Sequence, residues 1–251
     1  MTAPRQPLIE ICVEGIDGLI AAQQAGADRV ELCASLLEGG ITPSFGTVRE
    51  AQRLATIPFH VIVRPRGGDF LYSEAEFASM LADVAALRDL AVAGVVIGCL
   101  TADGDIDEAR TAALVNAARP LSVTCHRAFD MTRDASAALE ALVRCGVDRV
   151  LTSGQRDTAT EGVELLATMV KQAAGRIIIL GCGALDPVNI GAVRTRTGLT
   201  EMHFASLNDV PSAMRFRNPN VGMGGTELDR EYRNTVTDGT LVKATIAAAR
   251  T

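Results

Sequence analysis

Short apolar runs rich in β-branched residues alternate along this chain with longer stretches of helical period that are rich in alanine and leucine. The apolar runs predict eight strands, at Leu8–Val13, Arg29–Cys33, Phe59–Val63, Gly94–Leu100, Leu121–Cys125, Arg149–Thr152, Arg176–Leu180 and Met202–Ala205. The clearest helices are predicted at Glu74–Leu90, Asp107–Ala118, Ser136–Cys145 and Glu161–Ala173. Strand–helix alternation favours a parallel sheet, and eight such units in 251 residues predict an α/β fold of the (β/α)8 TIM-barrel type.

The predicted units repeat one another, and nothing in the sequence separates them into domains. Ala25–Val30 resembles Cys145–Val150, and in both a helix ends at glycine just before a strand begins. We therefore expect a single TIM-barrel domain over residues 1–251, with a long segment, Leu207–Gly225, after strand eight. Loops of this length are commonly functional, so we expect this one to cover the barrel mouth or to form a subunit interface in a homo-oligomer.

Composition narrows the possible partners. The net charge of −6 and the pI near 5.2 argue against nucleic acid or an anionic membrane surface. No apolar run approaches the length of a membrane span, and the N-terminus lacks the apolar region of a secretory signal. We expect a cytoplasmic protein whose six cysteines are reduced thiols, with no organic cofactor.

Side chains that alternate along a barrel strand point by turns to the helices and to the lumen. In strand one the apolar set should face the helices, which leaves Glu10 and Cys12 facing in, and strand two repeats the pattern with Glu31 and Cys33. The same rule turns a further set of residues inward: His60, Ile62, Arg64, Gly98, Ser122, Thr124, His126, Thr152 and His203. His60 begins its strand, so we interpret it as structural.

The inward residues Glu10, Glu31, Arg64, His126 and His203 predict a polar ring, for which two interpretations stay open. One is a buried ion-pair network. The other is an acid–base site at the C-terminal ends of the strands, where TIM-barrel enzymes keep their active sites. In that case Glu10 or Glu31 is the base, His126 its partner, and Arg64 holds the charge of the substrate.

Cys12 and Cys33 are the two cysteines most expected to lie close together. Two thiolates suit a soft ion such as Cu(I), whereas two small buried apolar side chains are the alternative. The neighbouring carboxylates of Glu10 and Glu31 should raise the pKa of these thiols and oppose formation of the thiolates.

Two segments predict contacts with an anion. Arg64 and Arg66 flank a proline before Gly67 and Gly68, in a turn that either serves a ligand or is an ordinary surface loop. Strand seven leads into Gly183, Asp186 and Pro187 follow as the expected start of a helix, and strand eight leads to Ser206. Barrel phosphate sites use these two loops, so Arg66, Gly183 and Ser206 are predicted to bind an anion.

Several segments together resemble the CutC family: Glu10–Val13, Ala27–Cys33, Glu38–Ser44, Arg64–Phe70, His126–Asp130, Leu151–Gly154 and Met214–Asn218. The resemblance implies a single-domain cytoplasmic barrel with a role in copper homeostasis, and it implies that Cys12 and Cys33 are the family's candidate copper-binding thiols. The polar ring and the arginine-containing loop leave a second possibility open. This is an enzyme that acts on a small anionic or phosphorylated metabolite.

Overall fold

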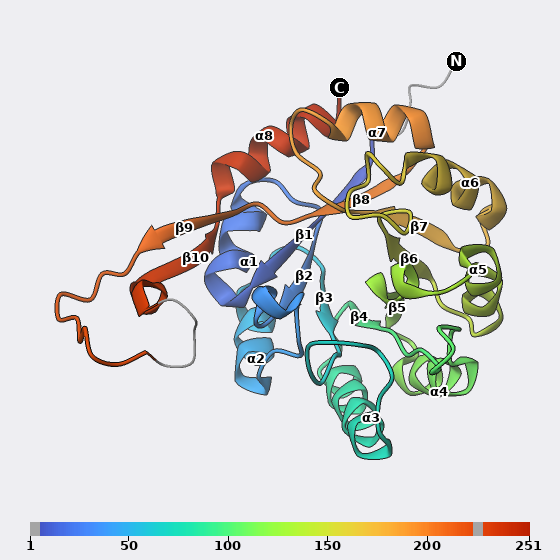
Figure 1. Cartoon of the computed structure of the whole chain (residues 1–251), viewed down its shortest axis with the longest axis horizontal. Helices are drawn as coiled ribbons and strands as arrows, with labels where there is room; N and C mark the ends of the chain where they lie inside the picture. The colour runs from blue at the N-terminus through green and yellow to red at the C-terminus, as the bar shows by residue number, and fades with distance from the viewer. Residues whose placement is uncertain (1–5, 223–227) are drawn as a thin grey trace.

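The computed structural model describes residues 6–222 and 228–251. Eight parallel strands close into a barrel in sequence order, with β1 hydrogen-bonded to both β2 and β8 (Figure 1). They are β1 (Leu8–Glu14), β2 (Arg29–Cys33), β3 (Phe59–Ile62), β4 (Gly94–Ile97), β5 (Ser122–Cys125), β6 (Arg149–Thr152), β7 (Ile178–Gly181) and β8 (Glu201–Phe204). The TIM barrel predicted from the sequence is confirmed.

Eight helices in the described part of the chain surround the barrel: α1 (Gly15–Gln24), α2 (Phe45–Leu54), α3 (Glu74–Asp89), α4 (Glu108–Ala118), α5 (Ala135–Arg144), α6 (Val163–Ala173), α7 (Ile190–Thr197) and α8 (Gly239–Ala249). Local sequence explains where several begin. Ser73 and Glu76 form a capping box at the start of α3, and Asp238 accepts hydrogen bonds from two backbone N–H groups of α8. Within these described helices, none is long and apolar enough to cross a membrane.

The hydrophobic core is divided by the wall of the barrel. Ile9, Ile11 and Val13 of β1 are fully buried against the helical layer, as the alternation predicted. Inside the barrel, Cys12, Cys33, Ile62 and Val96 form a separate small cluster. The lumen is therefore packed, and the polar residues that share it occupy fixed positions.

The start of α7 differs from the sequence prediction. Asp186 and Pro187 were expected to begin the helix, but α7 begins at Ile190, behind a turn over residues 187–189. The side chain of Asp186 accepts hydrogen bonds from the N–H groups of Val188 and Asn189, so it caps this turn instead.

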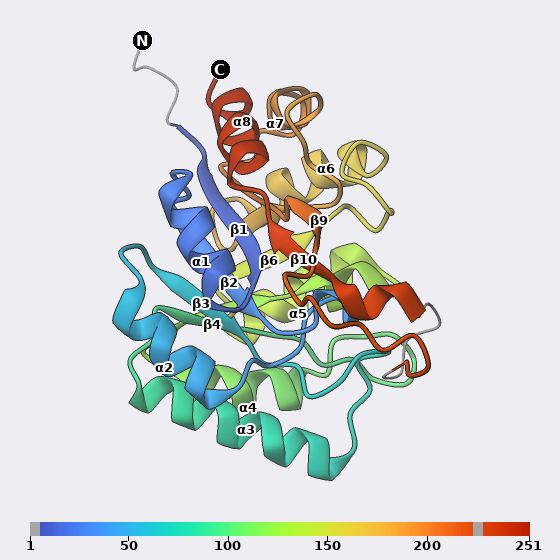
Figure 2. The same cartoon turned by 90° about the vertical axis from the view of Figure 1, so that its left-hand side faces the viewer.

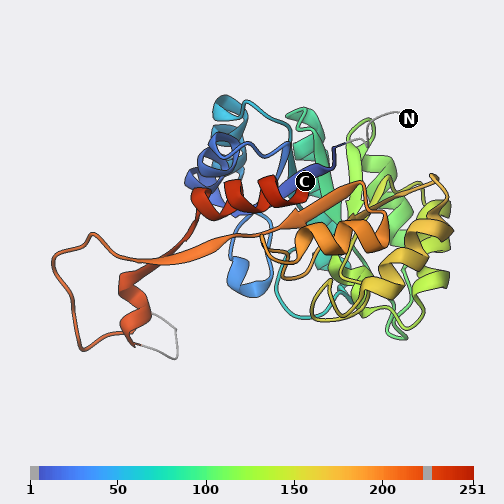
Figure 3. The same ribbon diagram turned by 90° about the horizontal axis from the view of Figure 1, so that it is seen from above.

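The segment after β8 is a hairpin, whereas the sequence predicted an irregular loop. β9 (Leu207–Pro211) pairs antiparallel with β10 (Arg233–Thr237), and a short 3-10 helix, Leu228–Tyr232, leads into β10. The pairing was missed because β10 lies beyond the segment considered. The hairpin extends away from the barrel in Figures 1 and 3 and points toward the viewer in Figure 2. Residues 1–5, part of the N-terminus considered for a secretory signal, and Met223–Gly225 lie outside the described residues.

Candidate functional site

The lower layer of the lumen, at the N-terminal ends of the strands, is a buried ion-pair network. Arg29 of β2 donates hydrogen bonds to Glu10 of β1 and, at 2.7 Å between Nη2 and Oε2, to Glu201 of β8. Arg149 of β6 reaches the same Glu201 oxygen with its Nε at 2.7 Å. Two arginines thus face two carboxylates across the barrel, and each buried charge has an opposite partner.

His203 of β8 connects this network to the residues above it. Its Nδ1 lies 2.8 Å from Oε1 of Glu10, and its Nε2 lies 3.7 Å from Oε2 of Glu31. Burial lowers the pKa of His203, but the contacts with Cys12 and Glu10 outweigh burial and hold the pKa well above its usual range. Burial raises the pKa of Glu10, yet the hydrogen bond from His203 and the charge of Arg29 bring it well below its usual range. The pair is therefore an imidazolium beside a carboxylate at neutral pH.

Cys12, Glu31 and Cys33 form a compact group next to His203. The Sγ atoms of Cys12 and Cys33 lie 3.7 Å apart, and one ligand atom from each of the three residues lies within 4.8 Å of the other two. All three side chains are at least nine-tenths buried. Such a group of two thiols and a carboxylate could hold a metal ion.

The two thiols differ in acidity. The hydrogen bond from Cys33 lowers the pKa of Cys12 to about 5, against the effect of burial. The same hydrogen bond and burial raise the pKa of Cys33 well above its usual value. Burial, together with the negative charge on Cys12, raises the pKa of Glu31 well above its usual range. The expectation that the carboxylates raise both thiol pKa values is wrong for Cys12, because the hydrogen bond from Cys33 stabilises its thiolate.

Arg64, directly after β3, holds the loops at the mouth of the barrel. Its Nη1 donates to the carbonyl oxygens of Glu38 at 2.6 Å and Gly40 at 3.0 Å, and its Nη2 donates to the carbonyl of Gly68 at 2.9 Å. The guanidinium carbon also lies 5.1 Å from the centre of the Phe70 ring. Arg64 is buried, and no carboxylate in the described part of the chain pairs with it. Its positive charge therefore lies beside the pocket.

His126 at the end of β5 presents one nitrogen to the pocket. Its Nδ1 accepts a hydrogen bond from the N–H group of Ala128 at 3.1 Å, so its remaining proton lies on Nε2. Burial and the charge of Arg64 lower the pKa of His126 to about 3. The buried Nε2 has no hydrogen-bond partner within the described structure, and the same is true of Oε1 of Glu31. Gly98 makes room for the ring, since a Cβ there would lie 2.4 Å from Cε1 of His126.

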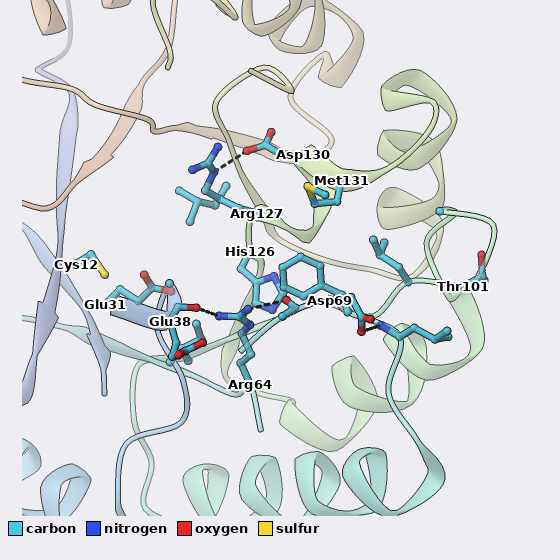
Figure 4. A pocket seen from close by; sticks show the side chains of 18 of the residues that line it. Cys12, Glu31, Glu38, Arg64, Asp69, Thr101, His126, Arg127, Asp130 and Met131 are labelled. Carbon is cyan, nitrogen blue, oxygen red and sulfur yellow. Dashed lines mark hydrogen bonds and ion pairs between the residues drawn. The ribbon is translucent and has the colours of Figure 1, made fainter. Parts of the chain in front are cut away.

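These groups line a pocket of about 720 Å³ at the C-terminal ends of the strands (Figure 4). Its polar lining includes Cys12, Glu31 and His203 together with Arg64 and His126. Its apolar wall comes from several loops and strands: Ile62, Phe70, Leu71, Leu100, Met131 and Leu151. Polar groups that converge at the end of a mostly apolar hollow are typical of sites for small molecules.

Arg127 and Asp130 also line the pocket, although they were not among the predicted site residues. Arg127 donates to Asp130 through Nε at 2.8 Å, and Asp130 accepts hydrogen bonds from both the N–H and the Oγ of Ser153. The signal for them was present, because both belong to the His126–Asp130 segment that supported the family resemblance.

Five predicted residues do not line this pocket. Glu10 lies in the network below it, and Cys33 is buried behind Cys12. Arg66 forms ion pairs with Glu76 and with Asp69, at 2.6 and 3.1 Å. Gly183 accepts a hydrogen bond from the N–H of Ala159, and Ser206, which is buried, accepts one from the N–H of Asp238.

Thr152 was predicted to face inward on strand six, and the alternation is the other way round. Leu151 lines the pocket, and Arg149 points into the network. The Oγ1 of Thr152 instead donates to Asp130 at 2.5 Å. Each face of this four-residue strand carries one polar and one apolar residue, Arg149 with Leu151 and Thr152 with Val150. The alternation therefore gave no clear choice of face.

The fold and this pocket define a TIM-barrel protein with a buried group of thiol, carboxylate and imidazole side chains at the C-terminal mouth. A model of the CutC family matches residues 7–208. A family protein CutC of Mesorhizobium japonicum is 74% identical over 249 residues, which cover 99% of this chain and 96% of that protein. The human copper homeostasis protein cutC homolog is 42% identical over 243 residues, which cover 97% of this chain and 89% of that protein. The chain belongs to the CutC family.

Solved structures agree with this assignment. The crystal structure of a protein from Streptococcus agalactiae that is assigned as the copper homeostasis protein CutC superposes with a TM-score of 0.76 at 31% identity, covering 79% of this chain and 98% of that one. The phosphoribosyl anthranilate isomerase of Thermococcus kodakaraensis has a TM-score of 0.53 at 17% identity and covers 97% of this chain and 99% of that one, which shows a common fold alone.

Proposed function

We propose that this chain takes part in copper homeostasis by binding Cu(I) through the thiolates of Cys12 and Cys33. The observation that carries the proposal is the 3.7 Å separation of their Sγ atoms, beside a pocket that Cys12 lines. Two sulfur atoms that share one ion, each at about 2.3 Å, can lie at most about 4.6 Å apart, so the pair needs a movement of under about 1 Å to share an ion. Copper is the cargo here.

The surroundings of the thiols favour a soft monovalent ion. Thiolate ligands select Cu(I) over harder ions, and Cys12 borders the pocket, which supplies a path to the pair. Binding would release the proton of Cys33, since only thiolates coordinate. The six cysteines are free thiols, which suits a reducing compartment, and we propose the cytoplasm.

Titration of Cu(I) against a competing chelator tests this function. We expect one ion per chain, and we expect Cys12→Ser and Cys33→Ser each to weaken the affinity by about tenfold or more, because each removes one of two soft ligands. Cys145→Ser is the matched control, because that thiol sits at the end of α5, on the outside of the barrel. Equal affinity in the wild type and both pocket variants would remove the pair as the copper site.

A second candidate function is acid–base catalysis on a small anionic metabolite. Its support is the pair of buried pocket atoms without partners, Oε1 of Glu31 and Nε2 of His126, beside the positive charge of Arg64. Glu31 would exchange a proton with the substrate, His126 would donate a hydrogen bond from Nε2, and Arg64 would favour the negative charge. Glu10 is already engaged below the pocket, so Glu31 is the better choice of the two carboxylates.

Thermal shifts with small carboxylates and phosphate esters would find such a ligand. Once an activity is found, Glu31→Gln and His126→Asn should each lower turnover by about 10²-fold or more. Normal turnover in both variants would limit these residues to a structural role. The anion site at Arg66, Gly183 and Ser206 stays a separate proposal. If it exists, phosphate should raise the melting temperature, and Ser206→Ala should reduce the effect while Ser212→Ala on the hairpin should not.

A further inference from the structure

Arg64 and Arg127 both line the pocket, but they differ in how far their donors are used. Arg64 is buried and already donates hydrogen bonds to three backbone carbonyl groups. Arg127 follows directly after His126, and its side chain is 46% exposed. In the view of Figure 4, the two arginines lie on opposite sides of His126. Neither proposed function uses Arg127.

Arg127 is held in place through two of its three nitrogens. Its Nε donates to Oδ2 of Asp130 at 2.8 Å, and its Nη2 donates to Oγ of Ser153 at 2.8 Å. Asp130 is itself fixed, because it also accepts hydrogen bonds from the hydroxyl of Thr152 and from the N–H group of Gln155. Within residues 6–222 and 228–251, Nη1 of Arg127 has no hydrogen-bond or ion-pair partner. Its two N–H groups are therefore available from a position that is already ordered.

Two further polar atoms indicate that the same pocket receives a ligand. Oε1 of Glu31 and Nε2 of His126 are buried, and neither has a hydrogen-bond partner among the described residues. Both side chains belong to residues that are more than nine-tenths buried and that line the pocket. Native proteins leave few buried polar atoms unpaired, so a bound molecule would complete these two.

The lining of the pocket indicates the class of that ligand. Phe70, Leu100 and Met131 contribute to a mostly apolar wall, which suits a ligand with an apolar body. In the described part of the chain, two arginines line the pocket against four residues with carboxyl groups, Glu31, Glu38, Asp69 and Asp130. A dianion such as a phosphate monoester would be repelled by these groups, whereas a single carboxylate needs only one free cationic donor.

We propose that the pocket binds a monocarboxylate with an apolar body, and that Arg127 selects its carboxylate group. Nη1 of Arg127 donates a charge-assisted hydrogen bond to the carboxylate. The apolar body lies against Phe70 and Met131, and a second polar group of the natural ligand reaches Glu31 and His126. Arg127 is thus a specificity-determining residue. The inference rests on the second candidate function, since both place an anionic small molecule in this pocket, but it concerns binding alone.

Two apolar carboxylates, phenylacetate and isovalerate, and their neutral amides test the proposal in metal-free protein. Binding is followed by NMR of the ¹³C-labelled methionine methyl groups. Met131 lines the pocket and should shift, whereas Met214, which is 60% exposed on the hairpin, should not. We expect each acid to bind with a dissociation constant of about 1 mM. Each amide should bind about tenfold more weakly or worse, because it keeps the shape of the acid but loses the charge-assisted hydrogen bond.

The ratio of acid to amide affinity identifies the role of Arg127. Arg127→Gln should bring this ratio close to one, whereas a merely structural change would weaken both ligands alike. Arg156→Gln is the matched control and should keep the ratio, because that arginine is exposed and does not line the pocket. An unchanged ratio in Arg127→Gln would overturn the assignment of this residue. If that variant does not fold, the comparison of acid and amide in the wild type decides, and equal affinities would overturn the proposal.

Two other outcomes would overturn the class of ligand. One is tighter binding of phenyl phosphate than of phenylacetate, and the other is no shift of Met131 with either acid at about 10 mM, well above a millimolar dissociation constant. Failure of the proposed functions is seen separately. Normal turnover in Glu31→Gln would refute the acid–base role and leave carboxylate binding in place, and unchanged Cu(I) affinity in Cys12→Ser would refute the copper site alone.

Discussion

Nδ1 of His203 lies 2.8 Å from Oε1 of Glu10, inside the barrel and between residues 193 positions apart in the sequence. This contact joins the buried network of Arg29, Glu201 and Arg149 to the group of Cys12, Glu31 and Cys33. The positive charge of the imidazole is therefore stabilised from both sides, by Cys12 of this group and by Glu10 of the network.

Replacing Glu10 should show how strongly the network depends on this carboxylate. Glu10→Gln leaves Arg29 and protonated His203 without their shared counter-ion, and a buried pair broken on one side commonly costs about 3–5 kcal/mol. Urea unfolding should report a loss of this size. Glu50→Gln, at an exposed pair with Arg53 on α2, is the control and should leave the midpoint nearly unchanged. Equal stability of the two variants would show that the network is not needed for the stability of the fold.

The pKa values of the three histidines of the chain should depart from that of free imidazole in different directions. Burial lowers the pKa of His60 to about 4, and burial with the charge of Arg64 lowers that of His126 to about 3, whereas that of His203 is raised. Imidazole proton NMR should therefore find His60 and His126 neutral down to about pH 5, one to two units above these pKa values. His203 should be protonated at neutral pH. A normal midpoint near 6.5 for all three would contradict the observed contacts.

The same shifts make stability depend on pH. His60 and His126 bind protons in the unfolded chain below about pH 6.5 but not in the folded one, so stability falls as the pH drops toward 4, by up to about 1.4 kcal/mol per unit for each. His203 acts in the opposite sense. Its contribution is complete below about pH 6.5 and is lost as the pH rises through its folded pKa. His126→Asn should flatten the acid side of the profile, and an unchanged slope would refute this account.

Gly98 should be intolerant of a side chain. A Cβ there would lie 2.4 Å from Cε1 of His126 and 2.9 Å from Cβ of Ala128, so Gly98→Ala must displace the ring at a cost of about 1–3 kcal/mol. Gly46→Ala in α2 is the matched control, because its Cβ would meet only Ser44 Oγ at 3.9 Å. Helix propensity favours alanine there by up to about 1 kcal/mol. Thermal unfolding distinguishes the two, and equal effects would count against the close approach.

Arg64 should not be replaceable by lysine. Its two terminal nitrogens serve three carbonyl groups from two loops, and an ammonium group cannot reproduce this fork. Arg64→Lys should cost about 1.5–3 kcal/mol, and hydrogen exchange should accelerate at Glu38–Gly40 and Gly68. Arg53→Lys is the surface control. Exchange that stays slow in the Arg64 variant would show that the loops hold their place without it.

The sequence by itself determined the barrel and much of its lumen. Alternation along β1 and β2 placed Glu10, Cys12, Glu31 and Cys33 inside, because a strand has a period of two and its apolar face must meet the helices. The rule worked where one face was plainly apolar. On β6 it failed, since Arg149 and Thr152 are both polar and only one of them faces the lumen.

The tertiary structure decided which inward residues act together. Arg29 and Glu201 are 172 positions apart, and only closure of β8 on β1 brings them into contact. The polar ring expected from the sequence is therefore two layers, a paired network below and a pocket with unpartnered Glu31 and His126 atoms above. The hairpin of β9 and β10 likewise depends on pairing across a long connection. Periodicity along one strand gives the direction of a side chain, but its distance and charge partners are set by strands that the sequence does not place side by side.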